Sequence, residues 1–245
     1  GTGAGRNPFD EAGADLVEAM RPPVVSFHFG LPEPALLARV KATGAIVMSS
    51  ATTVAEARWL EARGADVIIA QGLEAGGHRG HFLSHDLTEQ LGLFALVPQV
   101  VAAVKVPVVA AGGIASAACV RAALALGASG VQAGTAFLRT PEADTSALHR
   151  AALASDDARH TALTNLFTGR PARGIVNRFL REHGPMSELA PAFPLATAAS
   201  GPLRAAAEKR GSPDFSALWS GQNASGARPV PAAEIVRGLS AGLPG

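Results

Sequence analysis

The stretch VIIAQGLEAGGHRG, residues 67–80, decides the fold class, because an apolar run ends abruptly in a glycine-rich turn. The turn carries a histidine, His78, directly after Gly76 and Gly77. Glycine adopts backbone dihedrals that other residues avoid and lets a ligand approach the main chain closely. Exposed amide groups in such a turn can hold a phosphate or a flat ring. The stretch therefore predicts a buried strand that ends at a ligand site.

Two more junctions of this kind follow. Residues 106–111 run into Gly112 and Gly113, and residues 130–133 run into Gly134 and Thr135. Many (β/α)₈ barrels build a phosphate site from the loops after their last two strands, helped by a helix N-terminus. The three junctions indicate one shared ligand, although tight turns without a ligand would also use glycine here.

The chain around these junctions alternates between strand and helix patterns. We expect strands at 24–29, 45–49, 66–71, 107–111 and 130–133, and helices at 34–43, 53–64, 94–104 and 116–126. The second helix should begin with a capping box formed by Thr53 and Glu56. Near-continuously apolar strands joined by helices predict a parallel α/β sheet, either a closed barrel or an open doubly wound sheet. A closed barrel needs eight strands, and five are visible.

The pattern changes after residue 140, where proline and glycine interrupt helical segments at 145–154, 204–209 and 232–241. We expect residues 1–140 to form the α/β part with the ligand site, and residues 141–245 to form a helical segment packed on it. The glycine-rich residues 1–5 follow no strand, so they are expected to be a flexible end and not a phosphate loop.

Composition points to small-molecule chemistry. The 245 residues are 48% hydrophobic and 17% charged, which is enough to bury a core. The net charge of +1 comes from well-mixed residues, so no nucleic-acid partner is expected. The single cysteine, Cys119, lies in an apolar repeat and indicates a reducing compartment. With no signal or membrane segment in view, we expect a cytoplasmic protein.

Two histidines are candidates for chemistry. His78 lies in a glycine-flanked loop and suits proton transfer near neutral pH, although it could simply cap backbone groups. Ser26 and His28 share one face of the strand at 24–29, and His28 stands near its carboxyl end, where α/β proteins place their sites. A structural histidine is the alternative for His28. His81 and His85 raise the question of a metal, but no cysteine supports such a set, and we expect none.

With these residues assembled, the chain resembles the nitronate monooxygenases, FMN enzymes formerly called 2-nitropropane dioxygenases. The resemblance runs from about Val24 to the end, in matching order and spacing. The matching segments are residues 26–30, SFHFG; 70–80, AQGLEAGGHRG; 110–114, AAGGI; 132–138, QAGTAFL; and 169–174, GRPARG.

The resemblance implies a (β/α)₈ barrel of the TIM type that binds FMN without a covalent bond. His78 would be catalytic, taking the α-proton of a nitroalkane or steadying the anionic nitronate, and His28 with Ser26 would bind substrate. Dioxygen would complete oxidation to a carbonyl compound and nitrite. The implied cofactor contacts are Gln71, Gly76, Gly77, Gly112, Gly113, Gln132, Ala133, Gly134 and Thr135.

The chain departs from the family in one respect, since three strand-helix units expected before Val24 are not visible. A barrel without them is open, and we expect it to aggregate, to form a homodimer or to bind FMN poorly. The competing interpretations are another FMN barrel, such as an NADH:quinone reductase or an enoyl-acyl carrier protein reductase, and an inactive barrel fragment. Residues 170–173 add two arginines, Arg170 and Arg173, for which pairing with acidic neighbours is expected.

Overall fold

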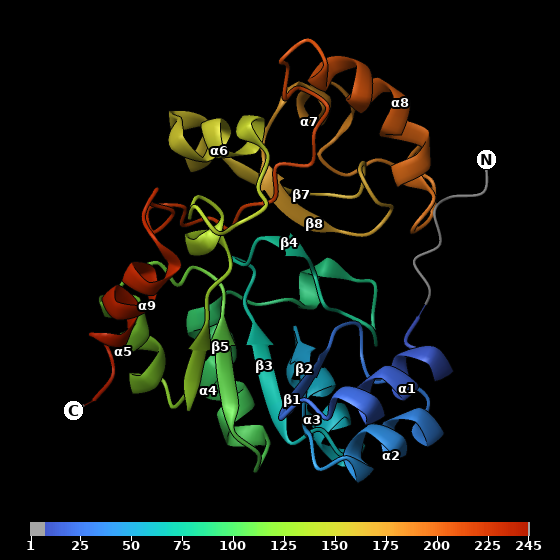
Figure 1. The fold of residues 1–245 in the computed structure, drawn as a ribbon, viewed down its shortest axis with the longest axis vertical. Helices are drawn as coiled ribbons and strands as arrows, with labels where there is room; N and C mark the ends of the chain where they lie inside the picture. The colour runs from blue at the N-terminus through green and yellow to red at the C-terminus, as the bar shows by residue number, and fades with distance from the viewer. Residues whose placement is uncertain (1–7, 245) are drawn as a thin grey trace.

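The computed structural model describes residues 8–244, and the glycine-rich residues 1–5 lie outside them. Five parallel strands form the main sheet in the order of the chain (Figure 1). They are β1 (Val24–Phe27), β2 (Ile46–Ala51), β3 (Val67–Gln71), β5 (Val108–Ala111) and β6 (Gly130–Gln132). The predicted parallel α/β fold is confirmed, and all five strands were expected from their apolar runs.

Helices cover one face of this sheet. They are α1 (Glu11–Met20), α2 (Pro34–Ala42), α3 (Val54–Ala62), α4 (Leu93–Ala103) and α5 (Ala117–Ala125). Ile68, Ala70 and Val108 point into this helix-covered core, whereas Val24 and Ile46 on the opposite face are 43% and 47% exposed. A doubly wound sheet would carry helices on both faces, so the arrangement is of the barrel type. In residues 8–244, β1 and β6 each have one neighbour, so both edges of the sheet are open there.

The first helix was not expected from the sequence. Asp10 caps α1 by accepting a hydrogen bond from the Gly13 amide. Arg39 of α2 holds the helix through ion pairs with Glu11, Asp15 and Glu18. α1 is short and largely exposed, and Ala14 is its buried residue.

The segment 141–245 contains strands as well as helices, so its description as helical was incomplete. β7 (Thr161–Thr164) and β8 (Ala172–Ile175) form an antiparallel sheet with β4 (Gly77–His78), in the order β4-β8-β7. The helices there are α6 (Ala147–Ala154), α7 (Arg178–His183), α8 (Ala196–Glu208) and α9 (Ala232–Ser240). We call β7, β8, α6, α7 and α8 the small unit; Figure 1 shows it above the main sheet, with α9 back beside α5. Polar residues in β7 and β8 hide the alternation that marks a strand.

The expected capping box is only half formed. The Thr53 side chain accepts a hydrogen bond from the Glu56 amide, as predicted, and begins α3. The Glu56 carboxylate does not return to Thr53, because it accepts instead from the amide and hydroxyl of Thr52 and from the amide of Phe82. Glu56, which is 1% exposed, therefore ties α3 to the loop that follows the His78 turn.

Within residues 8–244, none of the helices is both long enough and apolar enough to cross a lipid bilayer.

Candidate active site

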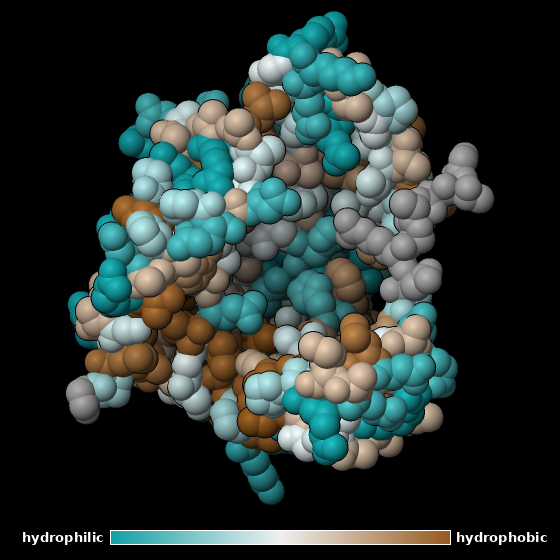
Figure 2. Space-filling view, viewed as in Figure 1, coloured by the Kyte–Doolittle hydropathy of each residue, from teal (hydrophilic) through white to brown (hydrophobic). Residues whose placement is uncertain are grey.

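A pocket opens where the carboxyl ends of the main strands meet the small unit. Figure 2 shows a hollow lined by hydrophilic residues between the two parts. Strand register brings the site together, because Gln71 pairs with Ala111, which in turn pairs with Gln132. The residues that line the pocket and were expected in the site are His28, Gln71, Gly76, Gly112, Gly113, Gln132, Ala133, Gly134 and Thr135. The three strand-to-glycine junctions therefore surround one cavity.

Different structural constraints favour glycine at the glycine positions of the pocket. Gly112 and Gly113 have φ of +129° and +68°, which a side chain would strain. A Cβ on Gly76 would lie 2.5 Å from the Gly221 amide nitrogen, so this position needs close backbone packing. A Cβ on Gly134 would meet nothing within 4 Å, so the space beside Gly134 is open to a ligand.

A second loop closes the pocket, and sequence reasoning missed it. The amide of Gly221 donates to the hydroxyl of Thr135 at 2.9 Å, and the side-chain amide of Asn223 donates to the Gly113 carbonyl at 3.2 Å. Gly221 and Asn223 line the pocket together with Ser50, Ile69, Ala75, Ala111 and Ile114. The run Gly221-Gln222-Asn223 has turn composition, which was the available signal, but it follows no strand-like run.

Gln71 holds the turn that carries His78. Its side-chain amide donates to the His78 carbonyl at 3.0 Å and accepts from the Gly80 amide at 2.8 Å. Gln71 therefore serves the shape of the turn as well as lining the pocket. Gly77, with φ of +73°, makes the turn but does not line the pocket, so its expected cofactor contact stays a prediction.

Arg79 lies beneath the same turn and is fully buried. Its guanidinium donates to the carbonyls of Gln71 and Gly72, at 2.8 and 2.7 Å, and to the Gln90 side chain at 2.7 Å. Burial lowers the pKa of Arg79 to about 10, so it remains a cation at neutral pH. Arg79 therefore stabilises the carboxyl end of β3 by binding its last carbonyl groups.

His78 lies beside the pocket, between the small unit and the segment that follows β1. Its Nε2 is 2.9 Å from the Thr168 hydroxyl oxygen. The imidazole contacts the rings of Phe29, Phe193 and Trp219, with centroid distances of 6.1, 5.9 and 5.6 Å. His78 does not appear among the residues that line the pocket itself. The structure thus places this imidazole in an aromatic enclosure at the edge of the cavity.

His28 lines the pocket, and Ser26 does not. The His28 Nδ1 lies 3.1 Å from the hydroxyl of Ser50, another lining residue that the sequence did not reveal. Surrounding protein atoms lower the pKa of His28 by desolvation, and the backbone carbonyl of His78 partly offsets this effect. Ser26 lies on the same strand face, two residues earlier, where it is exposed. Its expected contact with substrate stays a prediction.

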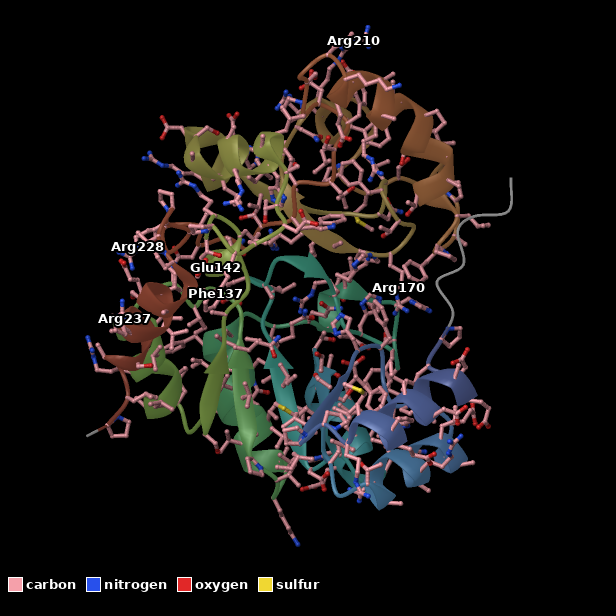
Figure 3. The ribbon with its side chains drawn as sticks, viewed as in Figure 1. Phe137, Glu142, Arg170, Arg210, Arg228 and Arg237 are labelled. Carbon is pink, nitrogen blue, oxygen red and sulfur yellow. The ribbon has the colours of Figure 1, made fainter. Side chains whose placement is uncertain are left out.

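The arginines after Gly169 bind carbonyl groups, which corrects the expectation that acidic side chains would pair with them. Arg170 donates to the His81 carbonyl at 2.5 Å, and its guanidinium lies 4.0 Å from the ring centroid of Phe29. Arg173 donates to the Leu73 carbonyl at 2.8 Å. Figure 3 shows Arg170 between the main sheet and the small unit. No group of three or more metal-ligating side chains occurs in the described part of the chain.

Comparison with known proteins agrees with this geometry. A family model described as nitronate monooxygenase matches residues 5–242. The chain belongs to the nitronate monooxygenase family. It is 47% identical over 220 residues to a nitronate monooxygenase of Pseudomonas aeruginosa, covering 89% of this chain and 63% of that protein. It is 43% identical to the nitronate monooxygenase of Paraburkholderia phytofirmans, covering 89% of this chain and 60% of that protein.

Solved structures give the same result. The chain superimposes on a nitroalkane oxidase from Streptomyces ansochromogenes with a TM-score of 0.89 and 46% identity, covering 98% of this chain and 69% of that one. It matches FabK from Thermotoga maritima less closely, with a TM-score of 0.75 and 28% identity, covering 96% of this chain and 72% of that one. The chain spans 59–63% of the length of the first curated nitronate monooxygenases that it matches.

Proposed function

We propose that this chain binds FMN in the pocket formed by its three strand-to-glycine junctions and oxidises alkyl nitronates, with dioxygen, to a carbonyl compound and nitrite. Neutral nitroalkanes would be substrates where His78 removes their α-proton. The observation that carries the proposal is the convergence of the three junctions on one cavity beside His78, in a chain of this family.

The residues present fit a flavin nucleotide. Gly134 has open space where a side chain would project, and Gly112 and Gly113 line the same pocket with backbone of positive φ. Ser116 caps α5 three residues after Gly113, so the positive dipole end of this helix lies close in sequence to the second junction. FMN, when bound, would supply the electron-accepting ring for the oxidation.

The chain's own residues would bind substrate, exclude water and move one proton. The rings of Phe29, Phe193 and Trp219 surround the half-buried His78 ring, which suits a carbon acid and its planar anion. His78 would take the α-proton of a nitroalkane and become an imidazolium beside the nitronate. Ser50 would hold the His28 ring at the pocket wall.

The direct test is oxygen consumption by the FMN-supplemented chain with the preformed anion ethylnitronate. We expect nitrite to form in step with oxygen uptake. The variant His78→Ala should lose turnover of neutral nitroethane by at least about 100-fold, because it removes a general base. It should retain FMN and oxidise preformed ethylnitronate, since that substrate needs no deprotonation. Equal loss of both substrates would assign His78 a different role.

The competing function is that of a pyridine-nucleotide-dependent FMN reductase, and the match to FabK keeps it open. Flavin bleaching by NADH in the absence of oxygen and nitronate distinguishes the two functions. Rapid bleaching would favour the reductase, whereas bleaching by ethylnitronate alone would favour the proposed oxidation. A chain that takes up no FMN would indicate an inactive fragment.

We also propose a homodimer, because the edges of β1 and β6 are unpaired within residues 8–244 and unpaired edges favour association. Light scattering on the FMN-supplemented chain measures this mass directly. A barrel architecture of the TIM type, the cytoplasmic location and the division at residue 140 remain part of the same proposal.

A further inference from the structure

The small unit contributes a buried hydroxyl to His78. Thr168 is 5% exposed and follows β7 in the turn that leads to β8. Its Oγ1 lies 2.9 Å from His78 Nε2, although the two residues are 90 positions apart in the sequence. This contact joins the turn after β7 to β4, the short strand that carries His78.

The same hydroxyl touches its own backbone. Thr168 Oγ1 lies 3.3 Å from the Arg170 carbonyl, to which it can donate, and 3.4 Å from the Arg170 amide, from which it can accept. A hydroxyl has a single proton to give. If Thr168 donates that proton to the Arg170 carbonyl, Thr168 Oγ1 accepts a hydrogen bond from a protonated Nε2 of His78. If it goes to Nε2, the histidine must carry its proton on Nδ1.

The first arrangement suits both charge states of the ring. A carbonyl can only accept a hydrogen bond, so the hydroxyl proton of Thr168 stays directed at the Arg170 carbonyl. The Nε2–H group of His78 then donates to Thr168 Oγ1, whether the imidazole is neutral or protonated. The second arrangement is broken when Nε2 gains a proton, and the hydroxyl must then rotate. A hydrogen bond to the charged form of a group stabilises that form.

We propose that Thr168 is a positioning residue for His78, which holds the ring as the Nε2–H tautomer and stabilises the imidazolium formed when His78 takes a proton. This inference rests on the proposed function only for its effect on turnover, because the tautomer and the pKa of His78 can be measured without substrate.

The test compares Thr168→Val, which keeps the shape and removes the hydroxyl, with Thr168→Ser, which keeps the hydroxyl. Two-bond ¹H–¹⁵N NMR of the FMN-supplemented protein gives the tautomer and pKa of His78, assigned by the signal that disappears in His78→Gln. We expect the Nε2–H tautomer in the parent chain. In Thr168→Val the pKa of His78 should fall by about 0.5–1 units, as expected for the loss of one hydrogen bond to the charged form.

Thr197→Val is the matched control. Thr197 lies in the same unit and donates its hydroxyl proton to the Phe167 carbonyl at 3.0 Å, so this variant also loses a hydroxyl-to-carbonyl bond. It should leave the His78 signal unchanged, as should Thr168→Ser. An unchanged pKa and tautomer in Thr168→Val, or an equal shift in Thr197→Val, would overturn the proposal.

A kinetic readout adds to the NMR result. The acidic inflection of kcat/KM for nitroethane should move to lower pH in Thr168→Val, while oxidation of ethylnitronate should not change. If no variant oxidises either substrate, the proposed function fails while the NMR titration still decides the role of Thr168.

Discussion

At the scale of single residues, the buried cation Arg79 is the main support of the site. Its three hydrogen bonds go to two carbonyls at the end of β3 and to Gln90, and no carboxylate bonds to it among the described residues. Replacement by methionine removes all three hydrogen bonds. The Gly72 carbonyl keeps a bond from the Ala75 amide at 3.1 Å, whereas a buried acceptor that loses its donor costs about 1–3 kcal/mol.

We therefore predict that Arg79→Met lowers the free energy of unfolding by about 3 kcal/mol in urea denaturation. Arg79→Lys should recover only part of this loss, because an ammonium group cannot reproduce the planar fork that reaches both carbonyls. A variant Arg79→Met with the stability of the parent chain would show that the guanidinium does not support the turn.

At the scale of elements, Thr53 and Glu56 have different roles at α3, although the sequence predicted one reciprocal capping box. Thr53 caps the helix, and the Glu56 carboxylate binds the Thr52 and Phe82 amides. Thr53→Ala should lower the free energy of unfolding by about 1 kcal/mol, and Thr53→Ser should not. Thermal unfolding of the two variants side by side measures the difference, and equal loss in both would assign the effect to the methyl group.

The elements also differ in whether their secondary structure could be predicted from the sequence. The five main strands and the helices between them were predictable, because each apolar run ends at a glycine or a capping residue that marks its limit. β7 and β8 were not, since Thr161, Thr164 and Arg173 interrupt any apolar alternation. The Gly221 loop could not be placed in the pocket, because its partner Thr135 lies 86 positions away and only the fold brings them together.

At the scale of the whole molecule, a buried histidine links stability to pH. His81 is 2% exposed, and its pKa is lowered to about 4, first by burial and then by the charge of Arg170. The unfolded chain binds this proton at pH values below about 6.5, whereas the folded chain does not until about pH 4. The unfolded state therefore binds more protons in this window, and stability falls as pH falls from about 6.5 to 4.

We predict that the urea midpoint decreases across this range and that His81→Gln, which cannot be charged, flattens the decrease. Denaturation curves at intervals of half a pH unit give the slope. A parent chain whose midpoint does not change between pH 6.5 and 4 would contradict the burial of a neutral His81.

The central claim is that three strand-to-glycine junctions form one FMN site, and titration of FMN fluorescence with the purified chain tests it most directly. We expect saturable quenching at one FMN per chain, weakened at least about tenfold in Gly134→Val, which corresponds to about 1.4 kcal/mol. Gly134 is the sharper position, because its added side chain would enter open space, whereas one on Gly113 would strain the backbone. Gly130→Val, in β6 but outside the pocket, is the control and should bind like the parent chain. Absence of quenching, or equal FMN affinity in Gly134→Val and the parent chain, would contradict the account.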